Sequence, residues 1–356
     1  MLGAQLKGVV RLLFEVIFMK AAVVYAPGDL RIEERPMPKV EQDDDVLIRI
    51  RAVGICGSDV HILHGNNPFV TYPRVMGHEM VGEVVECGAN ARGLSEGDHV
   101  VVEPISYGGK SYACGRRMPN VSEDLQVSGV HVDGGMQEYV LAKAAHVYKV
   151  DPDVPWTTAV LLEPYTIAGN STSRGDVGAG DTVLVQGAGP IGITVLRVAK
   201  AKGARVMVSD VVDDRLDYAL SCGADAVVNP LRQDLIGAVS EWTDGELANV
   251  VIDAACLPQT FAASFDVASV AGRIVVLGMG EQTAPIAQKP FMQKQLTVVG
   301  SRLQAFQFTP MIRLMEQGVI GDDGLVTHAF PFNQIADAFT LIENHPDKVR
   351  KVVLTF

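Results

Sequence analysis

The amino-acid sequence predicts an α/β protein of two domains, in which a mostly-β domain is followed by a doubly wound parallel sheet. The chain has 356 residues, which exceeds the usual size of a single domain. Up to about residue 150, short strand-like runs are separated by turns rich in glycine. After about Pro164, β-branched runs alternate with stretches long enough for helices, a pattern typical of βαβ units.

The first half of the chain is expected to form antiparallel strands. The first strand begins at Met19 and reaches Tyr25, and further strands are expected over residues 46–50, 81–85 and 99–102, where apolar residues alternate or cluster. Short turns should therefore join these strands into a sheet of the first domain.

The segment before Met19 has an apolar helical pattern with a narrow polar stripe of Lys7, Arg11 and Glu15. We expect Met19 to be the natural start of the protein, because the strand pattern begins there. A helix that contacts a second subunit or a membrane surface is the alternative.

The second half of the chain predicts six strands with helical crossovers, which suits a doubly wound dinucleotide-binding sheet. The expected strands cover residues 182–186, 205–209, 227–228, 250–252, 274–277 and 296–299. The expected helices cover the stretch from the glycine turn at 187–192 to about residue 202, and residues 215–220 and 231–242.

The turn Gly187-Ala188-Gly189-Pro190-Ile191-Gly192 follows a strand and opens a helix. In this context the glycines allow a tight turn and a close approach of the backbone to a pyrophosphate, and the helix N-terminus offers oriented N–H groups. We therefore expect Gly187, Gly189, Ile191 and Gly192 to bind a dinucleotide.

Asp210 ends the second of these strands, eighteen residues beyond Gly192. A carboxylate there accepts hydrogen bonds from both ribose hydroxyls and repels a 2′-phosphate, so it favours NAD over NADP. The alternative is that Asp210 is a helix N-cap.

A candidate metal site comes from two short runs, Gly54-Ile55-Cys56-Gly57-Ser58-Asp59-Val60-His61 and Gly77-His78-Glu79. They supply a thiolate, an imidazole and a carboxylate, a mixture that suits a zinc ion with one position open for substrate. Either run alone is as consistent with an inert buried cysteine or a satisfied histidine. Together, Cys56, His78 and Glu79 predict a catalytic zinc.

Ser58 and His61 are the candidates for moving a proton. Ser58 stands two residues beyond Cys56, so its hydroxyl can point to the same side as the thiolate. His61 can then pass the proton to water.

Composition and charge exclude several classes of partner. The chain has 42 acidic and 30 basic residues, with a formal net charge of -12, so it should repel nucleic acid. Its five cysteines lack the spacing of a disulfide framework, which fits a reducing cytoplasm. The longest apolar stretch, near the start, is broken by Arg11 and Glu15, and we expect no membrane span.

These motifs resemble the zinc-dependent alcohol and polyol dehydrogenases of the medium-chain dehydrogenase/reductase superfamily, over Met19 to Phe356. The resemblance implies a GroES-like catalytic domain over residues 19–165, a Rossmann NAD-binding domain over 166–305 and a return to the catalytic domain over 306–356. Residues 1–18 are left as an N-terminal extension.

The resemblance also implies roles for individual residues. Cys56 and His78 match zinc ligands, and Glu79 matches a neighbouring carboxylate that can swing onto the metal. Glu163, in Leu161-Leu162-Glu163-Pro164, matches the third protein ligand or a residue that holds a water. Ser58 and His61 match the proton relay, and Arg215 matches a position that steadies the adenosine ribose.

Within the superfamily, residues 65–69, 72–74, 129–135 and 301–303 are most similar to starvation-sensing-type zinc dehydrogenases and to L-galactonate or L-gulonate 5-dehydrogenases. Arg302 matches a substrate-contacting arginine of sorbitol dehydrogenases, although it could instead pair with a local carboxylate. Arg74 and His131 are further candidates for substrate contacts. The implied substrate is a sugar acid or a polyol.

One feature of the superfamily is incomplete in this chain. Many relatives hold a structural zinc on four cysteines, and the corresponding positions after Glu103-Pro104 are Gly108, Ser111, Cys114 and Ser122. A single thiolate cannot hold a tetrahedral structural zinc, so we expect only the catalytic ion.

The sequence therefore predicts a cytoplasmic, NAD-dependent zinc dehydrogenase that oxidises a secondary alcohol to a ketone, and that forms a homo-oligomer, either a dimer or a tetramer. A zinc-free reductase of the same fold is one alternative. An NAD-binding sensor or structural protein derived from a dehydrogenase is the other.

Overall fold

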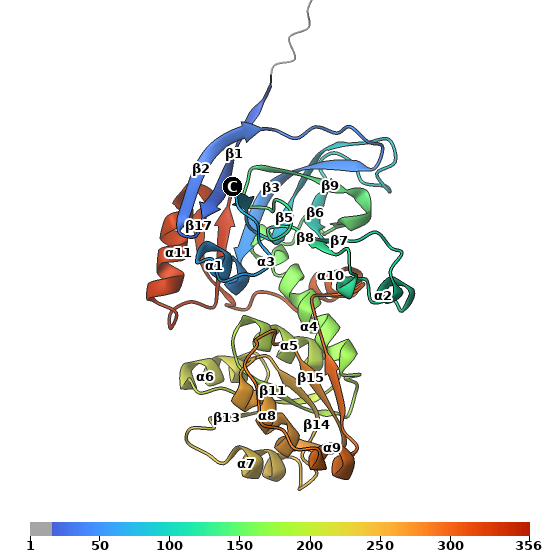
Figure 1. The fold of residues 1–356 in the computed structure, drawn as a ribbon, viewed down its shortest axis with the longest axis vertical. Helices are drawn as coiled ribbons and strands as arrows, with labels where there is room; N and C mark the ends of the chain where they lie inside the picture. Colours follow the sequence, from blue (N-terminus) through green and yellow to red (C-terminus); the bar gives the residue numbers. More distant parts are fainter. Residues whose placement is uncertain (1–15) are drawn as a thin grey trace, which may run out of the picture.

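The computed structural model describes residues 16–356. These residues form two lobes along the longest axis of the molecule (Figure 1), the upper one rich in strands and the lower one built on a sheet flanked by helices. The polar stripe predicted before Met19 lies outside the described residues. No helix of the described part has the length and apolar character that a membrane crossing requires.

The upper lobe contains a three-stranded sheet and a seven-stranded sheet. The first has the order β2 (Asp29–Pro36), β1 (Phe18–Ala26), β4 (Arg74–Val75). The second has the order β10 (Val147–Lys149), β6 (His99–Val102), β5 (Glu79–Cys87), β3 (Asp45–Ile55), β18 (Lys351–Thr355), β17 (Val326–Pro331), and β9 (Tyr139–Lys143) pairs with β3. A small pair is formed by β7 (Ile105–Ser106) and β8 (Gln126–Val127).

Short helices connect these strands. They are α1 (Gly57–Leu63), α2 (Tyr112–Gly115), α3 (Trp156–Ala159), α11 (Ile335–Asn344) and the 3₁₀ turns η1 (Pro119–Val121), η2 (Ala144–His146) and η3 (Phe332–Gln334). The four strands predicted in the first half are confirmed as parts of β1, β3, β5 and β6. The expected antiparallel pairing holds for these strands, whereas β17 and β18, from the end of the chain, pair in parallel.

The last strand of the chain joins the sheet of the first domain. β18 lies between β3 and β17 and pairs antiparallel with β3. Figure 1 accordingly places the C-terminus in the upper lobe among the N-terminal strands. Residues far apart in the sequence thereby meet at the end of β3.

The lower lobe is a six-stranded parallel sheet with the strand order of a Rossmann fold. The order is β13 (Ala226–Val228), β12 (Arg205–Ser209), β11 (Thr182–Gln186), β14 (Ala248–Asp253), β15 (Ala268–Val276), β16 (Thr297–Gly300). The associated helices are α4 (Leu162–Arg174), α5 (Pro190–Ala201), α6 (Asp213–Ser221), α7 (Leu235–Trp242), α8 (Pro258–Val267) and α9 (Lys289–Lys294). A further helix, α10 (Phe308–Glu316), contacts α4 and lies between the lobes in Figure 1. The predicted fold class, a mostly-β domain with a doubly wound sheet, is confirmed.

Local chemistry explains where the elements differ from the prediction. The helix expected from residue 231 begins at Leu235, because the Asp234 carboxylate accepts the N–H groups of Ile236 and Gly237 and caps the helix there. The sequence analysis named no helix for α4, α8, α9 or α10, and β15 begins at Ala268, earlier than expected.

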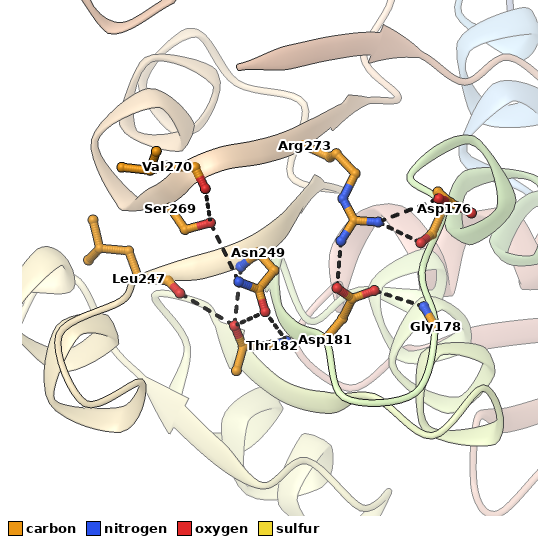
Figure 2. Close-up of polar contacts among 9 residues, drawn as sticks. All are labelled: Asp176, Gly178, Asp181, Thr182, Leu247, Asn249, Ser269, Val270 and Arg273. Carbon is orange, nitrogen blue, oxygen red and sulfur yellow. Dashed lines mark hydrogen bonds and ion pairs between the residues drawn. The ribbon is translucent and has the colours of Figure 1, made fainter. Parts of the chain in front are cut away.

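Hydrogen bonds and an ion pair of polar side chains connect β11, β14 and β15 near their amino ends (Figure 2). Arg273 of β15 donates to the backbone oxygen of Asp176 (2.6 Å) and to Asp181 Oδ1 (2.5 Å). The Thr182 N–H at the start of β11 donates to Asn249 Oδ1 of β14 (2.9 Å). These contacts lie at the edge opposite the carboxyl ends of the strands, outside which ligands generally bind in open α/β sheets.

The two lobes contact each other through side chains that are wholly or partly buried. Gln304 donates to the carboxylate of Glu103, and the rings of Tyr148 and Phe308 stack with centroids 5.1 Å apart. The domain boundaries at residues 165 and 305 remain predictions.

Candidate active site

The predicted metal ligands come together at the ends of two paired strands. β3 and β5 are antiparallel, with Gly54 opposite Glu79, so Cys56 just after β3 lies beside His78 and Glu79 at the start of β5. The ligand atoms of Cys56, His78 and Glu79 all lie within 4.8 Å of one another. Within residues 16–356, no other group of three His, Cys, Asp or Glu side chains is as close.

His78 is oriented by a residue that the sequence analysis did not single out. Its Nε2 lies 3.5 Å from Ser58 Oγ, and its Nδ1 lies 3.8 Å from Asp59 Oδ1. Asp59 is fully buried, and its carboxylate accepts the N–H groups of Cys56 (2.8 Å) and Gly77 (3.2 Å). Asp59 thus ties the two ligand-bearing runs together and faces the second nitrogen of His78, as carboxylates often do behind a metal-binding histidine.

A second unpredicted residue holds Glu79. Lys351, the first residue of β18, donates to Glu79 Oε1 (2.6 Å) and Oε2 (2.8 Å), and both side chains are buried. A Cβ at position 54 would overlap Glu79 Oε2, so Gly54 leaves the space that this carboxylate occupies. Lys351 therefore holds both oxygens of Glu79 in the space that Gly54 leaves, and β18 reaches the site because it pairs with β3.

Glu163 approaches the same cluster from the first turn of α4 and is 4% exposed. Burial raises the pKa of its carboxyl, whereas His78 lowers it. Glu163 is not part of the group of three closest ligand atoms, but it interacts electrostatically with Glu79 and Lys351.

The cluster has the charge and the donors that a divalent cation requires. Asp59, Glu79 and Glu163 are all buried, and within residues 16–356 the buried lysine Lys351 forms an ion pair with Glu79 only. Buried carboxylates are costly unless a positive charge compensates them. His78 Nδ1 is also buried without a hydrogen-bond partner in this structure. Because thiolate, imidazole and carboxylate donors converge here, the residues fit zinc.

The protonation of the site follows from the same contacts. Burial lowers the pKa of His78, but Asp59 and Cys56 raise it, and the net pKa is well above the usual value. Burial lowers the pKa of Lys351 too, and Glu79 and Cys56 more than offset that effect. The lysine therefore stays positively charged beside Glu79.

Both residues of the predicted proton relay lie on α1. Ser58 is half-buried and faces His78, whereas His61, one turn further along the helix, is exposed. This order, from a residue inside the site to one at the surface, is the one that a relay to solvent needs.

The predicted dinucleotide turn connects β11 to α5, with Gly189 as the N-cap. Gly187 has a φ of +97°, which disfavours other residues, and a Cβ at Gly192 would overlap the Gly187 carbonyl oxygen. By contrast, a Cβ at Gly189 would meet nothing within 4 Å. The turn is therefore tight on its inner side and open at Gly189, beside the helix N-terminus, which fits the approach of a pyrophosphate.

Asp210 lies beside this turn. Its Oδ2 accepts the Ala188 N–H (2.7 Å), and its Oδ1 accepts the Val212 N–H (2.9 Å). Val212, not Asp210, is the N-cap residue of α6. Each carboxylate oxygen keeps a second lone pair for a ribose hydroxyl. Arg215 is half-buried in the first turn of α6.

The three candidates for substrate contacts lie near one another but differ in their partners. Arg74 donates to Asp133 Oδ1 (3.1 Å), so this arginine already has a carboxylate partner within the protein. Burial, together with Arg302 and Arg74, lowers the pKa of His131, whose Nδ1 accepts the Val127 N–H (3.0 Å). Arg302 forms no ion pair with any carboxylate of the described chain, and it lines a cavity of about 540 Å³.

This cavity lies at the carboxyl ends of β15 and β16, bordered by Leu277, Gly278 and Ser301. Its size suits a small-molecule site. Cys56 and His78 are not among its lining residues, so it adjoins the nucleotide domain and not the metal cluster.

The positions of the incomplete structural zinc site form a hydrogen-bonded cluster. Ser122 donates to Ser111 Oγ (2.8 Å) and also contacts Asp124 Oδ1 (2.5 Å). Ser111 and Cys114 lie 3.3 Å apart, and the Gly108 N–H donates to Asp124 Oδ2 (2.8 Å). The Asp124 carboxylate therefore accepts hydrogen bonds from two neutral donors, the Gly108 N–H and the Ser122 hydroxyl, and these bonds hold the loop together.

Comparisons with known proteins agree with this geometry. Residues 42–152 match the family model "Alcohol dehydrogenase GroES-like domain", and residues 190–317 match "Zinc-binding dehydrogenase". The chain is 38% identical to the starvation-sensing protein RspB of Escherichia coli K12, over 95% of this chain and 99% of that protein. It is 33% identical to the L-galactonate-5-dehydrogenase of the same strain, with the same coverage of both chains.

A solved structure extends the likeness to three dimensions. The crystal structure of the alcohol dehydrogenase rspB from Escherichia coli CFT073, complexed with NADH, has a TM-score of 0.88 and 38% identity to this chain. It covers 95% of this chain and 99% of its own. With its GroES-like and nucleotide-binding parts both matched, the chain belongs to the zinc-type alcohol and polyol dehydrogenases of the medium-chain dehydrogenase/reductase superfamily.

Proposed function

We propose that this protein oxidises a secondary alcohol of a sugar acid or polyol to a ketone, with NAD as the acceptor and one catalytic zinc ion. Cys56 and His78 would hold the metal together with a carboxylate from Glu79 or Glu163. The observation that carries the proposal is the buried cluster of thiol, imidazole and carboxylate within 4.8 Å, in a chain of the zinc-type dehydrogenase family.

When bound, zinc supplies Lewis-acid polarisation of the substrate hydroxyl, and NAD supplies the hydride acceptor. The residues of the chain do the rest. Ser58 accepts the hydroxyl proton, and His61 carries it to solvent from its exposed position on α1. Asp59 keeps His78 in place, and the glycine turn holds the dinucleotide against the sheet.

The direct test is a screen of hexonates, polyols and simple alcohols with NAD, read as NADH absorbance. Turnover of a hexonate or polyol above that of ethanol or benzyl alcohol supports the proposal. A protein that binds NADH without turning over any alcohol would instead be a sensor or structural protein. Turnover that survives complete removal of metal would favour the zinc-free reductase.

We further propose a single zinc per chain, because Gly108, Ser111, Cys114 and Ser122 offer one thiol, and Asp124 already accepts hydrogen bonds there. A homo-oligomer is proposed because β16 ends the six-stranded sheet with one edge unpaired within the described chain. A cytoplasmic location is proposed because all five cysteines are free thiols.

Replacing Asp210 by serine is expected to narrow the preference for NAD over NADP. The carboxylate is placed to accept ribose hydroxyls and to repel a 2′-phosphate, and serine removes that charge. We expect the ratio of kcat/KM for NAD over NADP to fall by about tenfold or more, as for a lost hydrogen bond to a charged group. Steady-state kinetics with both cofactors measure this ratio.

A neighbouring carboxylate provides the control for this variant. Asp217 is exposed on α6, and Asp217→Ser should leave the cofactor ratio at the wild-type value. Because Asp210 also accepts the Ala188 N–H, Asp210→Ser should weaken NADH binding as well. A wild-type enzyme that uses NADP as well as NAD would contradict the assignment.

Replacing Arg302 by lysine is expected to reduce catalytic efficiency toward a hexonate by about ten- to a hundredfold, because lysine cannot reproduce a two-pronged contact with a carboxylate. The side chain lines the cavity and has no carboxylate partner among residues 16–356, so it is available to substrate. Kinetics with a hexonate at saturating NAD check this value.

Zinc content and NADH affinity should survive in Arg302→Lys, since neither group is placed on this side chain. Arg313→Lys, at an exposed site on α10 outside the cavity, is the matched control and should be unchanged. Unchanged kinetics in Arg302→Lys would remove Arg302 from the substrate site.

A further inference from the structure

The cavity beside Arg302 is lined by an unusual set of charges. Four arginines line it, namely Arg116, Arg117, Arg174 and Arg302, and no Asp or Glu is among the described lining residues. The chain as a whole has more acidic than basic residues, 42 against 30. A cavity with positive charge alone is therefore a local departure from the charge of the protein, and it favours an anion.

The charge of these arginines is not neutralised by the protein. Within residues 16–356, none of the four lies within ion-pair distance of a carboxylate. Arg174 donates through Nε to the backbone oxygen of Gly300 (3.0 Å), which leaves its terminal nitrogens available. The N–H donors of a planar guanidinium match the geometry of carboxylate and phosphate groups, so arginines whose donors are unused can bind such anions.

Two of the arginines that line the cavity are exposed to solvent. Arg116 and Arg117 are exposed and follow directly after α2, which Figure 1 shows at the side of the molecule near α10. The guanidinium of Arg117 lies 5.5 Å from the ring centroid of Phe306, another lining residue, and this cation–π contact holds it at the cavity wall. The cluster around Ser111, described above, fixes the loop that carries both arginines.

A buried acceptor in the same wall also lacks a partner. Asn120 is 6% exposed and lines the cavity, and its Nδ2 donates to the backbone oxygen of Arg302 (2.6 Å). A carbonyl oxygen can only accept, so this contact fixes the orientation of the amide. The Asn120 Oδ1 is left buried without a hydrogen-bond partner. Such an acceptor is costly unless a ligand donates to it, and a hydroxyl beside an anionic group would do so.

We propose that Arg116 and Arg117, together with Arg302 in the same cavity, bind a terminal anionic group of the substrate, a phosphate or a carboxylate, at the end remote from the oxidised carbon, with Asn120 accepting from a neighbouring hydroxyl. This assignment rests on the proposed dehydrogenase function and narrows its substrate to polyols with an anionic end. Neither Cys56 nor His78 lines the cavity, so the anionic end would bind outside the metal cluster.

The first experiment measures binding without turnover, so that its result does not depend on the dehydrogenase assignment. Inorganic phosphate is titrated calorimetrically into the full-length protein and into Arg116→Gln/Arg117→Gln. We expect the double variant to bind phosphate about tenfold more weakly, and binding to the wild type to weaken further at high salt. Arg313→Gln is the matched control, and its melting temperature and that of the double variant show that both fold.

The second experiment identifies the anion through kinetics with a hexitol, the matching hexonate and the hexitol phosphate. We expect the double variant to lower the kcat/KM of an anionic substrate relative to that of the neutral hexitol by about tenfold. A loss confined to the hexitol phosphate assigns a terminal phosphate, and a loss with the hexonate assigns a carboxylate. Either result supports the proposal.

Three outcomes would overturn it. One is equal phosphate binding by the wild type and the double variant, and another is an equal loss for the neutral hexitol. The third is a weaker affinity for NADH in the double variant, which would assign the arginines to the cofactor. An enzyme inactive on every alcohol but with arginine-dependent phosphate binding would refute the dehydrogenase proposal and leave the anion site standing.

Discussion

Replacing Cys56 by serine is expected to remove zinc from the protein and to reduce dehydrogenase activity by more than a hundredfold. Removing a residue that only hydrogen-bonds to a metal ligand typically lowers metal affinity or activity by roughly 10–100-fold. The loss in Cys56→Ser should be larger, because a ligand itself is removed. Without the thiol, His78 and Glu79 leave only two donors of the close group. Metal analysis of dialysed protein, together with the NADH assay, measures both effects.

Cys114 provides a matched cysteine for this experiment. It lies in the loop of the incomplete structural site, where it contacts Ser111 and Ser122. We expect the wild type and Cys114→Ser to hold one zinc per chain and Cys56→Ser to hold almost none. Full zinc occupancy in Cys56→Ser, or two ions per wild-type chain after removal of loosely bound metal, would contradict the ligand assignment.

Much of the candidate metal site could be predicted because thiol, imidazole and carboxylate side chains are the usual ligands of zinc. Cys56, His78 and Glu79 stand in two short runs, and the pairing of β3 with β5 brings those runs together. The sequence pattern indicates both strands, but it does not specify which strands pair or in which register. The resemblance to a known family supplied what the pattern lacked, including Glu163 on α4.

Two residues of the site were beyond the reach of the pattern. Asp59 lies within the first run, yet a carboxylate beside a serine on a helix is typical of a solvated surface. Lys351 contacts Glu79 across 272 residues of sequence, through a strand that enters the sheet from the far end of the chain. The one available signal was a lysine that opens the apolar run Val352, Val353, Leu354, and a strand-edge lysine is the simpler explanation of such a residue.

The fold was predictable where periodicity is strong and less so where local contacts decide. The strands of the parallel sheet are short β-branched runs, and their positions follow from composition. The start of α7 depends on the Asp234 cap, and α8 has small and polar residues that weaken its helical pattern. Element ends of this kind depend on individual hydrogen bonds, which a periodic pattern does not contain.

Replacing Lys351 by methionine is expected to destabilise the metal-free protein by about 3–5 kcal/mol, the cost of leaving a buried charge unpaired. Both partners of the pair are buried, with side chains 5% and 2% exposed for Lys351 and Glu79. Gly54 leaves the space that the Glu79 carboxylate occupies, and the carboxylate is buried there away from water. Chemical denaturation after chelation of metal gives the free energy of unfolding.

Two controls distinguish the cost of losing the buried ion pair from the cost of losing a lysine side chain. One is a surface lysine and the other is a double variant. Lys149 lies 2.7 Å from Asp98 with its side chain 52% exposed, so Lys149→Met should cost only about 0–1 kcal/mol. Glu79→Gln removes the charge that Lys351→Met leaves unpaired, and the double variant should therefore recover most of the loss. If Lys351→Met costs no more than Lys149→Met, or if the two losses simply add, the ion pair does not hold Glu79. Zinc should reduce the cost of Lys351→Met, because a bound cation compensates the same carboxylate from the other side.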